Sequence, residues 1–429
     1  MNNNDKRYDV VVWGATGFTG RLVCEYLATH YSVGTKALRW AIAGRSESKL
    51  KALRNDLLLW DEGADSLPIL LGESFDVESL TAIAEQARVV CTTVGPYLDY
   101  GAALVEACIK GGADYCDLTG ETPFIRKMVD KFHQSAADSG RRIVNCCGYD
   151  SIPSDLGCLM VQRAAKERYG ASCREVKLYV KRSKGGVSGG TIASMLGFVE
   201  RAATDKSITS VLGDPYALNP RGTWRGNDGS DQQSVEWDED VNRWTGAFLM
   251  AGINTRIVRR SNWLLEMEYG EGFRYGEVSI VGRGFRGRAQ GEMMRGAMGI
   301  FGALVAVSPT RWLLKKTVLP APGEGPNREE REAGFFHFEL RGKGTDTEGS
   351  PFVMTGEVKG DKDPGYAGTA RMLSEAAVCL ALDADTLPKR FGMLTPASSM
   401  GEVLIERLRA AGMIFSVVDD EAKESHDEA

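Results

Sequence analysis

The chain has 429 residues, of which 43% are hydrophobic and 26% are charged, a balance typical of a globular protein with two domains. Its net charge of -6 argues against nucleic acid as a partner, because binding to phosphate backbones requires a basic surface. The nine cysteines form no C-x-x-C pair and the start MNNNDKRYD has no apolar signal segment, so we expect reduced thiols and a cytoplasmic protein.

Short apolar strands alternate with helical stretches over residues 1–155. The expected strands are VVVW (10–13), RWAIAG (39–44), PILL (68–71), VVCTTVG (89–95), DYCDL (114–118) and RIVNCCG (142–148). Asp76 is placed to cap the third of the helices between them. This repeat predicts an α/β domain of Rossmann type, with a doubly wound parallel sheet.

Three glycines lie between the first expected strand and the first helix, in GATGFTG. Gly14 allows a sharp turn, Gly17 lets the backbone approach a pyrophosphate, and Gly20 lets the helix pack closely on the sheet. The helix N-terminus adds N–H donors and a partial positive charge. We therefore expect a dinucleotide site rather than a plain tight turn. Its residues are Gly14, Ala15, Thr16, Gly17, Phe18, Thr19 and Gly20.

The end of the second strand indicates which nicotinamide cofactor binds. An NAD site needs a carboxylate there to accept from the ribose 2′-OH, whereas this strand is followed by Arg45, Ser46 and Lys49. A guanidinium and a hydroxyl complement a 2′-phosphate, so NADP(H) is favoured. The alternative is that Arg45 is only a solvated turn residue.

The fourth strand runs into Val94, Gly95, Pro96 and Tyr97, which should line the crevice beyond the carboxyl ends of the strands. The alternative for these residues is a plain turn before the next helix. The same geometry brings DLTGE (117–121) and CCGYDSIPSDLG (146–157) to this edge.

Alternating strands of a mixed sheet follow, which predicts a second, α+β domain over residues 156–365. These strands are REVKLYVKR (174–182), NTRIVRRS (254–261), RYGEVSIVG (274–282), FFHFELRG (335–342) and PFVMTGEVKG (351–360). Alternation on a strand at 254–261 would send Arg256, Arg259 and Arg260 to both faces. The polar stretch 204–243 predicts a long surface loop or lid, and 419–429 an acidic disordered tail.

The uncharged segment GAMGIFGALVAV (296–307) is too short to span a bilayer, which needs about 20 apolar residues. The favoured interpretation is a buried helix. The alternative is peripheral contact with a membrane or lipid over residues 296–316, with Trp312, Lys315 and Lys316 at the headgroups.

Several motifs in this order resemble the saccharopine dehydrogenase-like oxidoreductases, most closely the branch of the trans-acting enoyl reductases. The matching stretches are GATGFTG, AIAGRS, VVCTTVGPYLDYG, YCDLTGE, GYDSIPSDLG, KGGVSGGTIASML, NTRIVRRSN, DPGYAGT and LTPASSMG. The resemblance implies a Rossmann domain completed by residues 366–418 and an NADPH-dependent reduction. In that branch the substrate is an acyl chain carried by a partner synthase, and a carbon–carbon double bond is reduced.

Two other functions stay open at this stage. One is an NADP(H)-binding, lipid-associated protein without chemistry, because the Tyr-x-x-x-Lys dyad of short-chain reductases is absent. The other is an amino-acid dehydrogenase of the saccharopine type. Asp, Glu, His and Cys do not cluster at ligand spacings, so no metal site is expected.

The candidate catalytic residues are those that the fold should place in the crevice, namely Tyr97, Tyr149, Asp150 and Ser151. Tyr97 could donate to a thioester carbonyl or cover the nicotinamide ring. Asp150 could be an acid or a relay, although the favoured interpretation is a cap for the helix that begins after Ile152, with Pro153 in its first turn. GGVSGGT (185–191) is either a loop that holds a substrate oxygen or a strand-to-helix turn.

Overall fold

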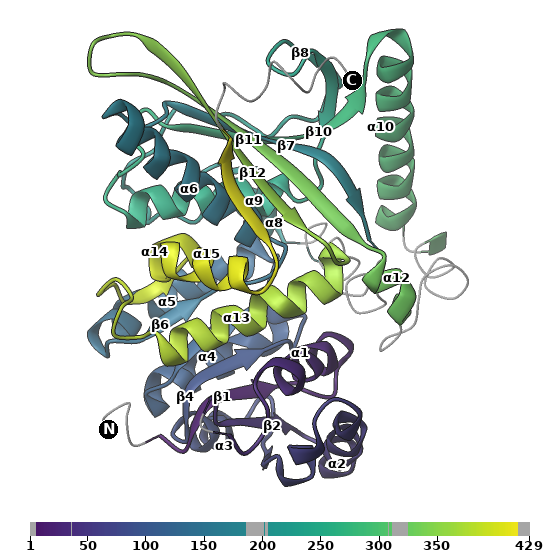
Figure 1. Ribbon diagram of the computed structural model, residues 1–429, viewed down its shortest axis with the longest axis vertical. Coiled ribbons are helices and arrows are strands. Elements are labelled where there is room, and N and C mark those ends of the chain that lie inside the picture. Colours follow the sequence, from purple (N-terminus) through teal and green to yellow (C-terminus); the bar gives the residue numbers. More distant parts are fainter. Residues whose placement is uncertain are drawn as a thin grey trace.

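The structure is a computed structural model that describes residues 6–418, except 36, 186–200, 202–204, 308 and 311–324. Two seven-stranded sheets form its framework, the first at the bottom of Figure 1 and the second at the top. Trp312, Lys315, Lys316, the tail 419–429 and nearly all of GGVSGGT lie outside the described residues.

The first sheet is parallel throughout, in the order β13-β6-β5-β4-β1-β2-β3. Its strands are β1 (Tyr8–Trp13), β2 (Trp40–Gly44), β3 (Ile69–Leu71), β4 (Ala87–Thr92), β5 (Asp114–Asp117), β6 (Arg142–Val144) and β13 (Gly392–Leu394). All six strands expected for the first domain are present, and the doubly wound sheet is confirmed. The seventh strand comes from the C-terminal segment.

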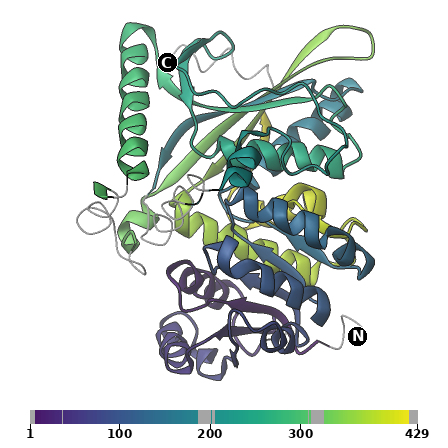
Figure 2. The same ribbon diagram turned by 180° about the vertical axis from the view of Figure 1, so that it is seen from behind.

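Helices cover both faces of this sheet (Figures 1 and 2). They are α1 (Phe18–His30), α2 (Glu47–Asp56), α3 (Val77–Ala84), α4 (Tyr97–Gly111) and α5 (Thr122–Asp138), with 3₁₀ turns η2 (Leu57–Leu59) and η3 (Glu62–Ser66). Alternate side chains of β1 divide the core: Val10 and Val12 pack in one cluster, Val11 and Trp13 in the other. Asp76 caps α3 as predicted, accepting from the amides of Glu78 and Ser79.

The second sheet has the order β14-β12-β11-β7-β10-β9-β8. Its strands are β7 (Glu175–Lys184), β8 (Glu236–Asp238), β9 (Arg243–Ala247), β10 (Arg274–Gly282), β11 (Phe335–Thr345), β12 (Pro351–Gly360) and β14 (Ile414–Val418). β7 and β10 run parallel and the other pairs antiparallel, so the mixed sheet is confirmed. The C-terminal segment therefore supplies one strand to each sheet.

The remaining helices lie between the two sheets or beside them. They are α6 (Ile152–Tyr169), α8 (Lys206–Gly213), α9 (Ala251–Leu264), α10 (Gly284–Ala306), α12 (Arg328–Glu332), the π-turn η4 (Pro364–Gly368), α13 (Thr369–Leu382), α14 (Pro396–Ser399) and α15 (Gly401–Ala410). α6 packs on β11 and β12 of the second sheet, while α13 packs on β1, β4 and β5 of the first.

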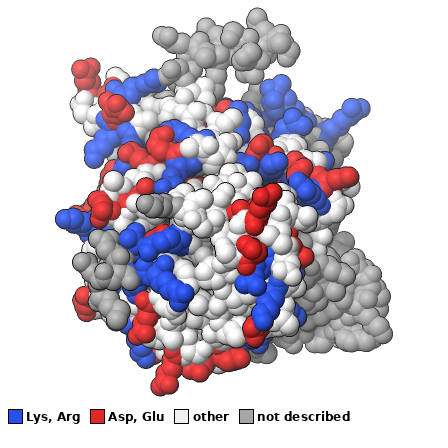
Figure 3. Space-filling view, turned by 60° about the horizontal axis from the view of Figure 1, so that its bottom comes forward, with Lys and Arg blue, Asp and Glu red and all other residues white. Residues whose placement is uncertain are grey.

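The face in Figure 3 presents Lys and Arg interspersed with Asp and Glu.

The prediction of a strand at 254–261 is wrong, because these residues belong to helix α9. Helical spacing places Arg256, Arg259 and Arg260 on one face, and all three are buried. Arg259 pairs with Asp228 at 2.7 Å and Arg256 pairs with Asp231. Buried polar partners therefore hold this helix in place together with its buried apolar side chains, such as Ile257 and Val258.

The expectation of a surface loop at 204–243 is confirmed for its middle part, because residues 214–235 form no helix or strand and residues 220–235 are all exposed or half-buried. This stretch contains α8 and β8, and Asp228 and Asp231 bind it to α9. Asp228 is 5% exposed on its side chain, so the pair with Arg259 is buried. Asp228 and Asp231 therefore anchor this loop to the domain at two points.

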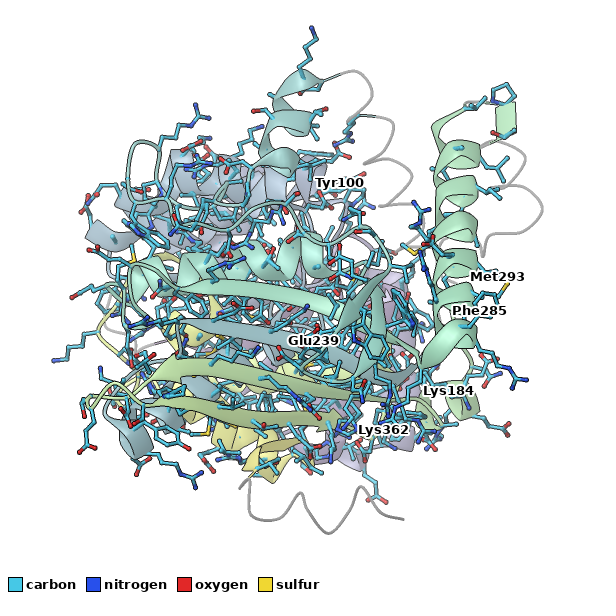
Figure 4. The ribbon with its side chains drawn as sticks, turned by 90° about the horizontal axis from the view of Figure 1, so that it is seen from above. Tyr100, Lys184, Glu239, Phe285, Met293 and Lys362 are labelled. Carbon is cyan, nitrogen blue, oxygen red and sulfur yellow. The ribbon has the colours of Figure 1, made fainter. Side chains whose placement is uncertain are left out.

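The expectation of a buried helix at 296–307 is also wrong. The segment is helical, as the end of α10, but every residue from Met293 to Leu304 is exposed. Ile300 is 65% exposed and Met293 70%. Figure 4 shows α10 beside the second sheet, with Met293 directed away from it. Among the described residues, no helix is both long and apolar enough to cross a membrane.

Candidate active site

The glycine loop leads from β1 into α1, and at two of its glycines a side chain would not fit. Gly14 has φ +84°, and a Cβ there would lie 2.4 Å from the side chain of Val94. A Cβ on Gly20 would lie 2.2 Å from the carbonyl oxygen of Gly14. A Cβ on Gly17 would meet only that oxygen, at 3.3 Å, so the space beside Gly17 is open. A close approach of another molecule to this turn is therefore feasible.

The N-terminus of α1 is free to receive an anion. Its N-cap is Gly17, which has no side chain to cap the helix, and the first turn contains no acidic residue. Thr16 and Thr19 are partly exposed there, Ala15 is buried, and Phe18 packs edge-on against Tyr366. Uncapped amide groups with the positive end of the helix dipole suit a phosphate.

A cationic edge lies next to the loop, because β2 pairs with β1 in parallel and ends at Gly44. Arg45 and Lys49 are exposed and have no ion pair among the described residues. Ser46 caps α2, accepting from the amide of Lys49 at 3.5 Å. No carboxylate occupies the strand end, so the surroundings fit an additional phosphate on the ribose.

The end of β4 contacts the glycine loop directly. Thr93 Oγ1 donates to the carbonyl of Gly14 at 3.3 Å, and Val94 fills the space over Gly14. Gly95 and Pro96 follow as the approach to α4, with Pro96 at its N-cap. Val94 and Thr93 therefore lie against the glycine loop, and Pro96 begins the helix that follows.

Tyr97 turns away from the crevice into the core. Its side chain is buried, its hydroxyl donates to the carbonyl of Thr92 at 3.2 Å, and its ring lies 5.7 Å from that of Phe124. The carboxylate of Glu121 accepts from the amide of Tyr97 at 2.8 Å and caps α4. The structure therefore gives Tyr97 and Glu121 structural contacts.

Asp117 at the end of β5 is an acceptor for several buried donors. It accepts from the hydroxyl of Tyr115 at 2.8 Å, the amide of Asn145 at 2.7 Å and the backbone of Cys146 at 3.0 Å. Burial raises the pKa of Asp117 to about 6, although these hydrogen bonds favour the charged form. Asp117 therefore organises the ends of β5 and β6.

Asp150 is the carboxylate that the fold leaves without a partner at this edge. It is half-buried, and Oδ2 lies 3.4 Å from the position of a Cβ on Gly120. No hydrogen bond or ion pair joins Asp150 to another described residue, and burial raises its pKa to about 7. The predicted capping role is wrong, because Ser151 is the N-cap of α6 and no side chain caps it. Such a carboxyl can hold a proton near neutral pH.

A buried aromatic cluster of the second sheet packs against the residue before Asp150. The ring of Tyr149 lies 5.3 Å from Phe336 and 5.6 Å from Phe338, and Phe248 lies 5.9 Å from Phe338. Burial raises the pKa of Tyr149, so its hydroxyl stays protonated. The surroundings on this side are apolar.

Ser151 is fully buried in an unusual backbone conformation, with φ +144°. Its hydroxyl donates to Oδ1 of Asn254, on α9, at 2.9 Å. Sequence reasoning missed Asn254, because the residue was assigned to a strand and lies about one hundred positions from Ser151. No local signal in the sequence could have joined the two.

A separate cavity of about 340 Å³ lies along the outer face of α1, between α12 and α13. Its lining includes Glu25, Tyr26, Arg331, Lys362 and Arg371. Both signs of charge meet there, and the residues of the glycine loop are absent from its lining. It is distinct from the crevice.

Comparisons with known proteins agree with this geometry. Residues 10–144 match the family described as saccharopine dehydrogenase NADP binding domain. The chain is 37% identical to the trans-acting enoyl reductase of Mycobacterium ulcerans over 97% of this chain and 99% of that protein. It is 41% identical to a provisionally named trans-acting enoyl reductase of Mycobacterium tuberculosis, over 96% of this chain and 98% of that protein.

Among solved structures, apo saccharopine dehydrogenase (L-Glu forming) from Saccharomyces cerevisiae matches with a TM-score of 0.52 and 12% identity. The match covers 96% of this chain and 99% of that one. At this identity the likeness shows the fold alone. Together with the relatives of high identity, the NADP-binding match shows that NADP(H) is the cofactor. The chain belongs to the saccharopine dehydrogenase-like family of NADP-dependent oxidoreductases, in the branch of the trans-acting enoyl reductases.

Proposed function

We propose that the protein reduces the carbon–carbon double bond of an enoyl thioester, with the acyl chain carried by a partner synthase or carrier protein. The names of its relatives support the reaction class. The hydrogen bonds and ion pairs of the α9 arginines indicate the substrate class. A site for a small, multiply charged amino acid would need cationic side chains that are not already paired within the protein.

Those arginines are already engaged inside the protein. Arg256 and Arg259 pair with Asp231 and Asp228, and Arg260 donates to the carbonyls of Leu218 and Met393. The second sheet instead places a buried aromatic cluster against Tyr149, the residue before Asp150. These surroundings favour an apolar acyl chain over an amino acid of the saccharopine type.

Each group of the crevice has a role in this proposal. Residues 14–20 hold the pyrophosphate, and Arg45, Ser46 and Lys49 hold the 2′-phosphate. NADPH, when bound by these residues, would supply the hydride that the reduction of the double bond requires. Protonated Asp150 then gives its proton to the α-carbon as the enolate collapses, and the carboxylate regains a proton from water.

The test is NADPH oxidation with 2-enoyl thioesters of coenzyme A and of an acyl carrier protein, with identification of the saturated product. Turnover with either thioester, faster with the carrier-bound one, is expected. Asp150→Asn should bind NADPH like the wild type. Its rate of reduction should be lower by at least about a hundredfold, which is the rate factor that a general acid usually contributes. Tight NADPH binding without turnover on any thioester would instead indicate a non-catalytic binding protein, and turnover of amino acids would contradict the substrate class.

We also propose that α10 contacts an anionic membrane surface. The helix is uncharged from Gly296 to Val307 and exposed on all sides from Met293 to Leu304, so a single flat protein partner would cover only part of it. Three exposed arginines lie at its start, Arg283 at the N-cap and Arg286 and Arg288 in the helix. None has an ion pair among the described residues, and Arg288 lies over the ring of Trp244. Apolar side chains beside cations suit an anionic lipid interface, in a chain that is acidic as a whole.

Sedimentation with vesicles tests this contact, with phosphatidylcholine alone compared with phosphatidylcholine containing phosphatidylglycerol. The wild type should sediment with the anionic vesicles, and the double variant Ile300→Glu/Phe301→Glu should stay in solution. Leu59→Glu/Leu71→Glu is the matched control, because these leucines are 87% and 51% exposed elsewhere. If the α10 variant bound the anionic vesicles as well as the wild type does, the proposal would be contradicted. A wild-type dimer in solution that is absent in the α10 variant and present in the control variant would also contradict it.

A further inference from the structure

The turn before α6 has a backbone conformation that its own sequence does not favour. Ser151 has φ +144°, a region that residues with a side chain rarely adopt, and it is fully buried. The amide of Ile152 closes the turn by donating to the carbonyl of Gly148 at 3.0 Å. A conformation of this kind persists only when the surrounding structure fixes it.

A buried chain of hydrogen bonds provides that fixation. Ser151 Oγ donates to Asn254 Oδ1 at 2.9 Å, and Asn254 Nδ2 donates to Glu277 Oε2 at 2.9 Å. The hydroxyl of Tyr275 donates to the other oxygen of Glu277 at 2.8 Å. Asn254 is 1% exposed and Glu277 2%. The chain therefore runs from the second sheet, through α9, to the turn that carries Asp150.

We propose that Asn254 is a positioning residue, which holds the Ser151 turn and so fixes the Asp150 carboxyl at the crevice. This inference rests on the proposed function for Asp150. The turn has two flanks: the amide of Tyr149 donates to Thr369 Oγ1 at 3.1 Å, and the side chain of Ser151 is held by Asn254. Asp150 lies between these two anchors and makes no bond of its own to another described residue. Its direction thus depends on its neighbours.

The groups that face Glu277 determine its charge and the orientation of the Asn254 amide. They are Ser154 from α6, Asn254 from α9 and Tyr275 from β10, with the charge of Asp231 nearby. Burial raises the pKa of Glu277 to about 7, and the neighbouring hydrogen bonds oppose this. A carboxyl that accepts from Asn254 Nδ2 leaves Oδ1 for Ser151, as observed.

The α9 helix offers a matched control for this inference. Asn262 is also fully buried, and its amide likewise makes one donated and one accepted hydrogen bond, to the carbonyl of Gly270 and from the amide of Tyr269. Neither bond leads toward Ser151. Asn254→Ala and Asn262→Ala therefore remove the same groups from the same helix, and only the first should affect Asp150.

Two readouts are compared in these variants, with NADPH and a carrier-bound enoyl thioester for the kinetics. Asn254→Ala should lower kcat about tenfold and displace its pH profile, with the Kd of NADPH unchanged, while Asn262→Ala keeps kcat within about twofold. Asn254→Asp keeps the acceptor for Ser151, so activity should recover below about pH 7, where protonated Glu277 can donate to it.

Amide hydrogen exchange over residues 148–152 is the second readout and does not require turnover. Exchange there should be faster in Asn254→Ala and unchanged in Asn262→Ala. Equal kcat losses in both variants, or unchanged exchange in Asn254→Ala, would overturn the positioning role. If the wild type turns over no thioester, the proposed function fails, and the exchange experiment still decides whether Asn254 holds the turn.

Discussion

Helices α9 and α10 follow one another in the chain and have opposite surroundings. α9 contains three arginines and two asparagines, all buried, and each has partners within the protein. α10 has a run of exposed apolar side chains, among them Met293, Ile300 and Leu304. The rule that apolar residues are inside and polar residues outside fails for both. What decides burial is whether the chain supplies a partner, and groups without one inside indicate a partner outside.

The largest change in stability is expected when one buried arginine of α9 is removed. Arg259→Ala removes the buried cation that contacts Asp228, so we expect the free energy of unfolding to fall by about 3–5 kcal/mol in urea denaturation. Arg274 offers the control, because it lies 3.9 Å from the same carboxylate but is 57% exposed. Arg274→Ala should cost less than about 1 kcal/mol. Equal losses in the two variants would mean that burial of the pair does not matter.

Arg45 is an exposed arginine with no ion pair among the described residues, so it tests whether such a group has a partner outside the protein. Arg45→Asp should weaken NADPH binding by about 10- to 100-fold, because the carboxylate would repel the 2′-phosphate, and should change NADH binding much less. Fluorescence titration of the bound nicotinamide measures both constants. Unchanged NADPH affinity would remove Arg45 from the site, and Lys49→Asp would then be the next variant.

Features that depend on neighbours in the sequence could be predicted. GATGFTG marks the strand, the turn and the helix start within a few residues, and Asp76 lies directly before the helix that it caps. A helix start just after Ile152 was predicted for the same reason, and α6 begins one residue earlier, at Ile152. Each of these depends on local backbone geometry, which short motifs specify.

Features that depend on distant partners could not be predicted. Arg259 meets Asp228 across 31 positions, and Ser151 meets Asn254 across 103, so alternation alone suggested a strand at α9. The apolar run of α10 suggested core, because the composition of a helix does not show what covers it. Asp150 was assigned to a cap because the conformation of Ser151 has no signature in the sequence.

The polar interior around α9 should also make stability depend on pH. Ser261 of α9 donates to Asp155 at 2.5 Å, and burial raises the pKa of Asp155 to about 7. The folded state therefore holds a proton that the unfolded state has released above about pH 4, so this group's contribution is present at low pH and is lost as the pH rises to about 7. In that window the free energy of unfolding should fall with rising pH less steeply for Asp155→Asn than for the wild type. The difference in slope should reach up to about 1.4 kcal/mol per pH unit. Parallel curves from urea denaturation at several pH values would contradict this.

The smallest effect is expected on the exposed helix, and it completes the contrast. Ile300→Ser on α10 removes an apolar side chain that is 65% exposed, so the free energy of unfolding should change by less than about 0.5 kcal/mol. The matched variant is Ile257→Ser on α9, where the side chain is 1% exposed and its loss should cost about 2–5 kcal/mol. If Ile300→Ser were as costly as Ile257→Ser, α10 would be packed within the isolated chain. A small cost would leave its apolar surface without a folding role, as expected of a surface that serves contact with another molecule.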